Sequence, residues 1–169
     1  MVSAAYILLG SNMGNKIRLL QEAAALIDRL AGKIVQYSSF YESEPWGFES
    51  DEWFINQVVV IRTSLSPEQL LKTTQEIERT LGRTTYRPTV GGERYTSRPI
   101  DIDILFYEEM IINTPALTIP HPLLHERLFT LQPLAEIAAD LIHPLFQKNI
   151  TILLEDCNDK VAVRKMNWK

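Results

Sequence analysis

Strand and helix patterns alternate along this chain in an order that few folds can accommodate. Alternating or continuous apolar runs predict strands at 4–9, 34–41, 54–63 and within 97–106, and apolar residues at helical spacing predict helices at about 15–30 and 66–81. The order is β-α-β-β-α-β. With right-handed crossovers between paired strands, this order predicts an α+β ferredoxin-like sandwich with both helices on one sheet face.

The second of these helices has the clearest boundaries. Ser66 is the expected N-cap, Pro67 the first helical residue and Gln69 its capping-box partner, and Gly82 is expected to end the helix. After residue 108 the patterns weaken. They predict only short additional elements: strands within 110–119 and helices at 122–128 and 133–141.

Isoleucine and aspartate alternate in the last strand of this core. Ile100, Ile102 and Ile104 are expected to face the core, which places Asp101 and Asp103 on the opposite face, about 7 Å apart. Two carboxylates so placed repel each other unless a cation lies between them, and Mg²⁺ commonly takes one or two protein carboxylates. The alternative is a solvent-exposed face that happens to carry two aspartates, although aspartate is depleted in strands.

The loop before this strand carries an excess of positive charge. Residues 82–98 contain four arginines (Arg83, Arg87, Arg94 and Arg98), no lysine and a single acidic residue, Glu93. Arginine suits bidentate recognition of phosphates, and the pair Gly91-Gly92 is expected to leave the loop mobile. Next to the aspartate pair, the loop favours a Mg²⁺–nucleotide site. A solvated surface loop is the alternative.

Composition limits the classes of protein that remain. The net charge of −4 and the pI of about 5.4 provide no basic field for nucleic acid, and the one cysteine, Cys157, excludes an internal disulfide. The N-terminal apolar run is too short for a signal peptide and no run approaches a membrane span. We therefore expect a single domain over residues 1–169, cytoplasmic, with no membrane, nucleic-acid or obligatory protein partner.

A set of motifs resembles a known enzyme family. In chain order they are Gly10-Ser11-Asn12, the run 38–47 (SSFYESEPWG), Phe54-Ile55-Asn56, Gln75-Glu76-Ile77-Glu78, Gly82-Arg83, the run 98–105 (RPIDIDIL) and Pro120-His121-Pro122. Over residues 4 to about 142, the chain closely resembles the 6-hydroxymethyl-7,8-dihydropterin pyrophosphokinases of folate biosynthesis. The resemblance implies the ferredoxin-like fold and transfer of pyrophosphate from ATP to the pterin hydroxymethyl group, with release of AMP.

The resemblance also implies roles for individual residues. Asp101 and Asp103 are expected to bind two Mg²⁺ ions, and Arg87, Arg94 and Arg98 to complete the catalytic set, Arg87 and Arg94 closing over ATP. The residues implied at the ATP site are Gln75, Glu78, Arg98, Ile104, Thr118, His121 and Arg127. The residues implied at the pterin site are Ser43, Trp46, Phe54, Asn56 and Phe129, with Phe54 and Phe129 on opposite faces of the ring.

Two other classes of protein remain as alternatives from the residues alone. A ferredoxin-like regulatory domain could bind a small ligand without chemistry, but this leaves the aspartate pair and the arginine cluster without a role. A nucleic-acid-binding domain would need basic and aromatic residues on the sheet face, where this chain carries two aspartates. Formation of AMP from ATP on addition of the reduced pterin distinguishes the enzyme from the binding module.

Overall fold

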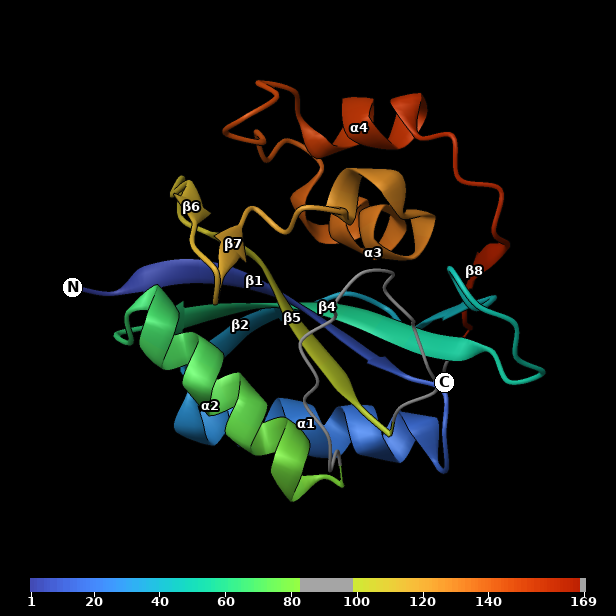
Figure 1. Cartoon of the computed structure of the whole chain (residues 1–169), viewed down its shortest axis with the longest axis horizontal. Coiled ribbons are helices and arrows are strands. Elements are labelled where there is room, and N and C mark those ends of the chain that lie inside the picture. Colours follow the sequence, from blue (N-terminus) through green and yellow to red (C-terminus); the bar gives the residue numbers. More distant parts are fainter. Residues whose placement is uncertain (83–98, 168–169) are drawn as a thin grey trace.

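The computed structural model describes residues 1–82 and 99–167, which form an α+β fold with an antiparallel sheet and four α-helices (Figure 1). The elements are β1 (Ser3–Ser11), α1 (Lys16–Leu30), β2 (Lys33–Tyr37), β3 (Tyr41–Ser43), β4 (Phe54–Thr63), α2 (Pro67–Thr80), β5 (Asp101–Tyr107), β6 (Ile112–Asn113), β7 (Thr118–Ile119), the 3₁₀ turn η1 (Leu124–Glu126), α3 (Leu128–Ala138), α4 (Ile150–Asp156) and β8 (Val163–Lys165).

The main sheet is built around β1 and β4. These two strands pair along their whole length, from Ser3 opposite Thr63 to Ser11 opposite Ile55. β5 pairs with the other edge of β1, while β2 and β3 pair with successive parts of β4, and β8 extends the sheet beyond β3. A separate two-stranded sheet joins β6 to β7. β5 therefore lies at an edge of the sheet, with the backbone of one side open to other partners.

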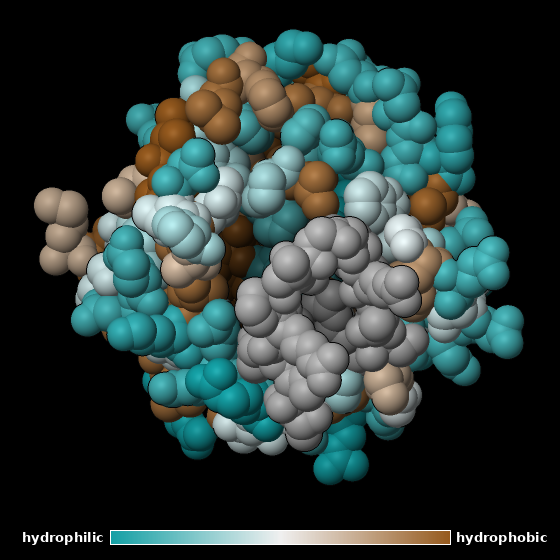
Figure 2. Space-filling view, in the orientation of Figure 1, coloured by the Kyte–Doolittle hydropathy of each residue, from teal (hydrophilic) through white to brown (hydrophobic). Residues whose placement is uncertain are grey.

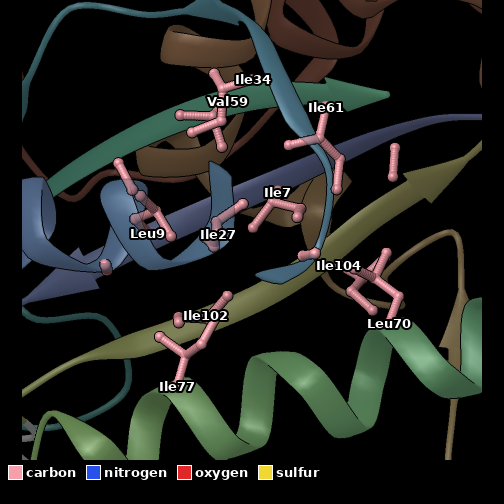
Figure 3. Close-up of a cluster of buried hydrophobic side chains, with 14 of the residues drawn as sticks. Ile7, Leu9, Ile27, Ile34, Val59, Ile61, Leu70, Ile77, Ile102 and Ile104 are labelled. Atoms are coloured by element: carbon pink, nitrogen blue, oxygen red, sulfur yellow. The ribbon is translucent and has the colours of Figure 1, made fainter. Parts of the chain in front are cut away.

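Helices α1 and α2 cover one face of the sheet and enclose the larger core (Figures 1 and 3). In Figure 3, Ile77 and Leu70 of α2 point at the sheet, where Ile102 and Ile104 of β5 lie. All four of these side chains are at most 5 % exposed. The isoleucines of β5 thus face the core as predicted, and burial of each such side chain contributes roughly 1.5–3 kcal/mol.

The opposite face of the sheet carries a second apolar cluster under α3 and α4. Leu8, Val58 and Phe106 of the sheet pack against Leu131 and Leu134 of α3. The two helices predicted from the clearer patterns, α1 and α2, lie together on one face as expected, and the elements after residue 108, whose place was not predicted, cover part of the other face. The cluster covers only part of this face, and the remaining part, toward the C-terminal end of β1, holds the candidate site.

The N-terminal boundary of α2 agrees with the prediction. Ser66 Oγ accepts a hydrogen bond from Gln69 N at 3.2 Å, and Gln69 Oε1 accepts one from Ser66 N at 2.9 Å, which is a complete capping box with Pro67 at the first position. Gly82 follows the helix with φ of +106°, a backbone conformation that glycine adopts most readily.

Three boundaries differ from those predicted. The strand expected at 34–41 is divided into β2 and β3, because Ser38 turns its hydroxyl to accept a hydrogen bond from Val58 N at 2.9 Å. The loop predicted for residues 42–53 begins only after β3. The helices expected at 122–128 and 133–141 are instead the turn η1 and the single helix α3, which contains Pro133. Burial of Leu131 and Leu134 outweighs the ~3 kcal/mol cost of an internal proline.

A carboxylate of α3 connects this helix to the sheet edge through three hydrogen bonds. Glu136 of α3 accepts hydrogen bonds from Ser39 N at 2.9 Å, Ser39 Oγ at 2.8 Å and the Tyr41 hydroxyl at 2.9 Å. Burial alone would raise the pKa of Glu136, but these hydrogen bonds lower it overall, and burial followed by the Glu136 charge raises the pKa of Tyr41. The network fixes α3 over β3.

A group of exposed apolar residues lies next to α4. Ile142, Leu145 and Phe146, which lead into α4, are 49 %, 56 % and 43 % exposed, and brown surface gathers near α4 in Figure 2. Within residues 1–82 and 99–167, no helix has the length and apolar content needed to cross a membrane.

The buried histidine of this region predicts a pH dependence of stability. His143 is 2 % exposed, its Nδ1 accepts hydrogen bonds from Leu145 N and Phe146 N, and burial, with a smaller effect from His125, lowers its pKa from 6.5 to about 4. At His143 the unfolded chain therefore binds a proton that the folded chain does not between these values, so this residue's contribution to the free energy of unfolding falls as pH falls from 6.5 toward 4, by at most about 1.4 kcal/mol per pH unit. Urea unfolding between pH 6.5 and 5 checks this. His143→Asn, which keeps an acceptor atom but cannot titrate, should remove this residue's share of the slope.

Candidate active site

The aspartate pair lies on the uncovered part of the sheet. Asp101 pairs with Gly10 of β1 and Asp103 pairs with Leu8, so the two carboxylates share the face that carries α3. Both line an open pocket of about 530 Å³. The sequence predicted this shared face from the alternation with isoleucine, and the structure adds that the face opens into a pocket.

A buried glutamate of α2 fixes the strand between the two aspartates. Glu78 is 2 % exposed, and its Oε2 accepts a hydrogen bond from Ile102 N at 3.0 Å. Ile102 lies on the edge strand, and among the described strands none pairs with β5 on the side away from β1. The carboxylate therefore sets the path of β5 at the residue that separates Asp101 from Asp103.

The floor of the pocket is a glycine next to a buried amide. A Cβ at Gly10 would lie 3.0 Å from Asn56 Oδ1 and 3.9 Å from the Phe54 ring, closer to the amide than side chains ordinarily approach. Asn56 is 2 % exposed, and its Nδ2 donates a hydrogen bond to Ser43 Oγ at 2.8 Å. This bond orients the amide at the pocket wall, where it is able to read the edge of a polar ring.

Aromatic side chains form the walls. Phe54 comes from the first residue of β4 and Phe129 from the first turn of α3, and both line the same pocket as Trp46. Arg127 is 5 % exposed, and its guanidinium carbon lies 4.6 Å from the centre of the Trp46 ring and 5.4 Å from that of Phe129. Cation–π contacts of this kind hold the arginine and both rings together.

His121 is in its neutral form beside these charges. Its pKa is lowered from 6.5 to about 4, mainly by burial and in addition by Arg127, while Asp101 opposes the shift. The ring therefore lies within the field of both charged groups. Its Nδ1 accepts a hydrogen bond from Leu123 N at 3.2 Å. The proton of the neutral ring is therefore on Nε2, which leaves that atom as a hydrogen-bond donor.

Three other residues expected at the ATP site do not line this pocket. Gln75 is half-buried on α2, Thr118 is half-buried on β7, and Ile104 is buried in the core against α2, on the face away from the aspartates. A nucleotide contact at Ile104 would therefore involve its backbone. The loop 83–98 lies outside the described residues, and the predictions for Arg87, Arg94 and Arg98 and for closure of this loop fall there.

The sequence analysis missed four residues that line the pocket: Leu8 and Gly10 of β1, and two residues of the loop that follows β3. Phe48 lines the pocket, and its ring meets that of Phe54 edge-on at 6.0 Å between centres; Glu44 lines it next to Ser43. Both belong to the loop after β3, where no periodicity marks which side chains turn inward. The nearby Pro45 and Gly47 predicted only an irregular segment.

Paired carboxylates beside an aromatic pocket and a buried arginine suit an enzyme that transfers a phosphorus-containing group to a flat, polar ring. Residues 6–139 match the sequence family described as 7,8-dihydro-6-hydroxymethylpterin-pyrophosphokinase. The chain belongs to this family. It transfers pyrophosphate from ATP to the hydroxymethyl group of 6-hydroxymethyl-7,8-dihydropterin, a reaction of folate biosynthesis.

Individual relatives agree with this assignment. The 2-amino-4-hydroxy-6-hydroxymethyldihydropteridine pyrophosphokinases of Porphyromonas gingivalis and Bacillus subtilis are both 44 % identical to the chain, over 82 % and 81 % of it and over 92 % and 79 % of their own lengths. A crystal structure of Plasmodium falciparum HPPK-DHPS has the same fold, with a TM-score of 0.76 and 18 % identity over 92 % of this chain. The chain spans 45 % of that larger protein.

Proposed function

We propose that the pocket between Asp101, Asp103, Phe54 and Phe129 is where this reaction takes place. One observation carries the proposal: a single pocket brings both carboxylates of β5 together with the aromatic walls and Asn56. The carboxylates would hold the metal–triphosphate end of ATP, and the aromatic end would hold the pterin. The acceptor hydroxyl and the phosphorus it attacks would then meet within the pocket.

The donor set fits Mg²⁺. Ionised carboxylates offer only acceptor oxygens, and Mg²⁺ typically takes one or two of them and completes its shell with water and phosphate. Within residues 1–82 and 99–167, no group of three or more histidine, cysteine or acidic side chains could hold a metal ion. Asp101 and Asp103 would hold two ions together with ATP, and bound Mg²⁺ would neutralise charge on the triphosphate.

The pterin side of the pocket is suited to a flat ring with polar edges. Stacking between Phe54 and Phe129 would contribute about 0.5–1.5 kcal/mol for each ring beyond burial. Asn56, held by Ser43, would pair with the amide-like edge of the ring, assisted by backbone groups of Ser43 and Trp46. A buried amide discriminates strongly, because a ring lacking the matching groups would leave it unpaired.

The protein's contribution to the transfer is positioning and charge. The hydroxymethyl oxygen bonds to the β-phosphorus while the bond from that phosphorus to the α-phosphate bridge breaks, and AMP leaves. Neutral His121 would donate from Nε2 to a phosphate oxygen, and Arg127 would add its charge. The part of the site that contacts the nucleotide would be formed by Gln75, Glu78, Thr118 and the backbone of Ile104. Arg87, Arg94 and Arg98 would complete the phosphate contacts. Such transfers depend mainly on alignment and electrostatics.

The strand order supports a finer description of the fold. Leaving out β3 and β8, the order β5-β1-β4-β2 with α1 and α2 on one face is that of a ferredoxin-like sandwich. We place the chain in this class as a single cytoplasmic domain that acts on ATP and the pterin, without nucleic acid or an obligatory protein partner.

A turnover assay tests the proposed arrangement. With Mg²⁺, ATP and reduced hydroxymethylpterin, the protein should form AMP and the pterin diphosphate in equal amounts. Omission of the pterin, or chelation of Mg²⁺ by EDTA, should stop AMP formation, and added Mg²⁺ should restore it. Phe129→Ala should raise the KM for the pterin and leave that for ATP nearly unchanged. AMP formation that is indifferent to chelation, or a Phe129→Ala effect confined to ATP, would contradict the arrangement.

A further inference from the structure

The last described segment of the chain joins the two walls of the pterin pocket. This C-terminal clasp, residues 159–166, lies beyond residue 139, where the family match ends. In Figure 1 the chain leaves α4 and descends along the side of the molecule to β8 at the edge of the sheet. There β8 pairs with β3, with Val163 opposite Ser43. Glu44 N donates to Ala162 O at 3.1 Å, and Ala162 N donates to Glu44 Oε1 at 2.9 Å.

The clasp reaches the second wall through Asp159. Its Oδ2 accepts a hydrogen bond from Leu128 N at 3.0 Å, and its Oδ1 accepts one from Val161 N at 3.0 Å. Leu128 is the first residue of α3, so its N–H has no acceptor within the helix. The N-cap residue, Arg127, makes no side-chain capping bond. Asp159 thus performs the capping role from a distant segment, and its charge suits the positive end of the helix.

The capped turn carries the ligand-facing residues of this wall. Phe129 is its second residue, and Arg127, which precedes the turn, lies over Trp46 on the opposite wall. Trp46 follows Glu44, which the clasp also binds. The clasp therefore fixes the two walls relative to each other: Asp159 contacts the first turn of α3, and Lys165 Nζ lies 3.4 Å from Glu136 Oε2 of the same helix.

We propose that Asp159 is a positioning residue for the pterin pocket, acting through the first turn of α3 to hold Phe129 and Arg127 against the β3 wall. This inference rests on the proposed placement of the pterin next to Phe129. Without the cap, the turn would occupy the binding-competent arrangement for a smaller fraction of the time, and the apparent affinity falls in proportion to that fraction. The proposed metal ligands lie on β5 and not on the capped turn, so binding of Mg²⁺–ATP should weaken less than binding of the pterin, with Arg127 as the residue that transmits the smaller effect.

Three variants test the proposal. Asp159→Ala should raise the dissociation constant for 6-hydroxymethylpterin about tenfold, and the KM for the reduced pterin likewise, with the dissociation constant for Mg²⁺–ATP raised by no more than about threefold. Asp159→Asn should restore only part of the affinity, because its one amide oxygen can accept from Leu128 N but not also from Val161 N. Asp156→Ala is the matched control, because this neighbouring carboxylate pairs with Lys148 at 3.0 Å. An Asp159→Ala variant that matches the control, or one that loses pterin and ATP binding by equal factors, would overturn the proposal.

Hydrogen exchange in the unsubstituted protein provides an independent test even if Asp159→Ala does not fold. The amide of Leu128 should exchange slowly, like that of Leu131, which bonds to Arg127 O at 3.0 Å within the helix. Fast exchange at Leu128 would refute the capping role. Phe129→Ala distinguishes the positioning role of Asp159 from the placement of the pterin. A loss of pterin affinity in Phe129→Ala without a loss in Asp159→Ala refutes only the positioning role. No loss of pterin affinity in Phe129→Ala refutes the assignment of the pocket to the pterin.

Discussion

Replacing Asp101 or Asp103 with alanine should lower turnover by a factor of about 10² to 10³ or more, the usual effect of removing a group that stabilises charge in the transition state. The two carboxylates share one sheet face and line one pocket, so each variant would lose half of the proposed metal ligands. The fold should survive, because both side chains are partly exposed and the neighbouring isoleucines form the core. Loss of mutual repulsion should leave the melting temperature unchanged or slightly raised. Steady-state assays and thermal unfolding measure both effects.

Two further variants sharpen this test. Asp101→Asn and Asp103→Asn keep the shape and remove the charge, and they should lose nearly as much turnover as the alanine variants. Glu109→Ala removes an exposed carboxylate just after β5 and should behave as the unsubstituted protein does. Turnover within tenfold of normal in either asparagine variant at saturating Mg²⁺ would refute the metal-ligand assignment.

Asn56→Ala should weaken pterin binding by about 1–3 kcal/mol, a factor of roughly 5 to 150. The amide is buried and held by Ser43, so its remaining polar atoms have a defined direction when the pterin enters. ATP affinity should change by less than about twofold, because Asn56 lies at the aromatic end of the pocket. Calorimetry with each ligand in turn gives both numbers.

The partner of this amide provides the control. Ser43→Ala leaves the Asn56 amide in place and removes its anchor, so it should weaken pterin binding less than Asn56→Ala does. Asn113→Ala, at an exposed position on β6, should have no effect. ATP binding lost with pterin binding retained in Asn56→Ala would show that the pocket has been assigned to the wrong substrate.

Local sequence signals predicted much of what positions the site. The alternation of isoleucine and aspartate over 100–104 predicts which side chains of β5 face the core, and the capping box at Ser66 predicts the start of α2. Each of these signals depends on neighbours a few residues away. The family resemblance, in contrast, named Phe54, Asn56 and Phe129 as a group, and the structure brings them into one pocket.

Features that depend on distant contacts could not be predicted in this way. β8 has three residues and is held by pairing with β3, more than a hundred residues earlier. The continuous helix through Pro133 depends on a buried face that its own residues do not reveal. Phe48 turns toward Phe54 from an irregular loop, and Asp159 caps a helix 31 residues away in the sequence. No local pattern encodes such pairings.

A crystal structure of the ternary complex with Mg²⁺, a non-hydrolysable ATP analogue and 6-hydroxymethylpterin tests the central claim most directly. It should show carboxylate oxygens of Asp101 and Asp103 about 2.0–2.1 Å from metal that also contacts the triphosphate. The pterin ring should lie between Phe54 and Phe129 with an edge on Asn56. Metal bound away from both aspartates, or a pterin outside this pocket, would contradict the account.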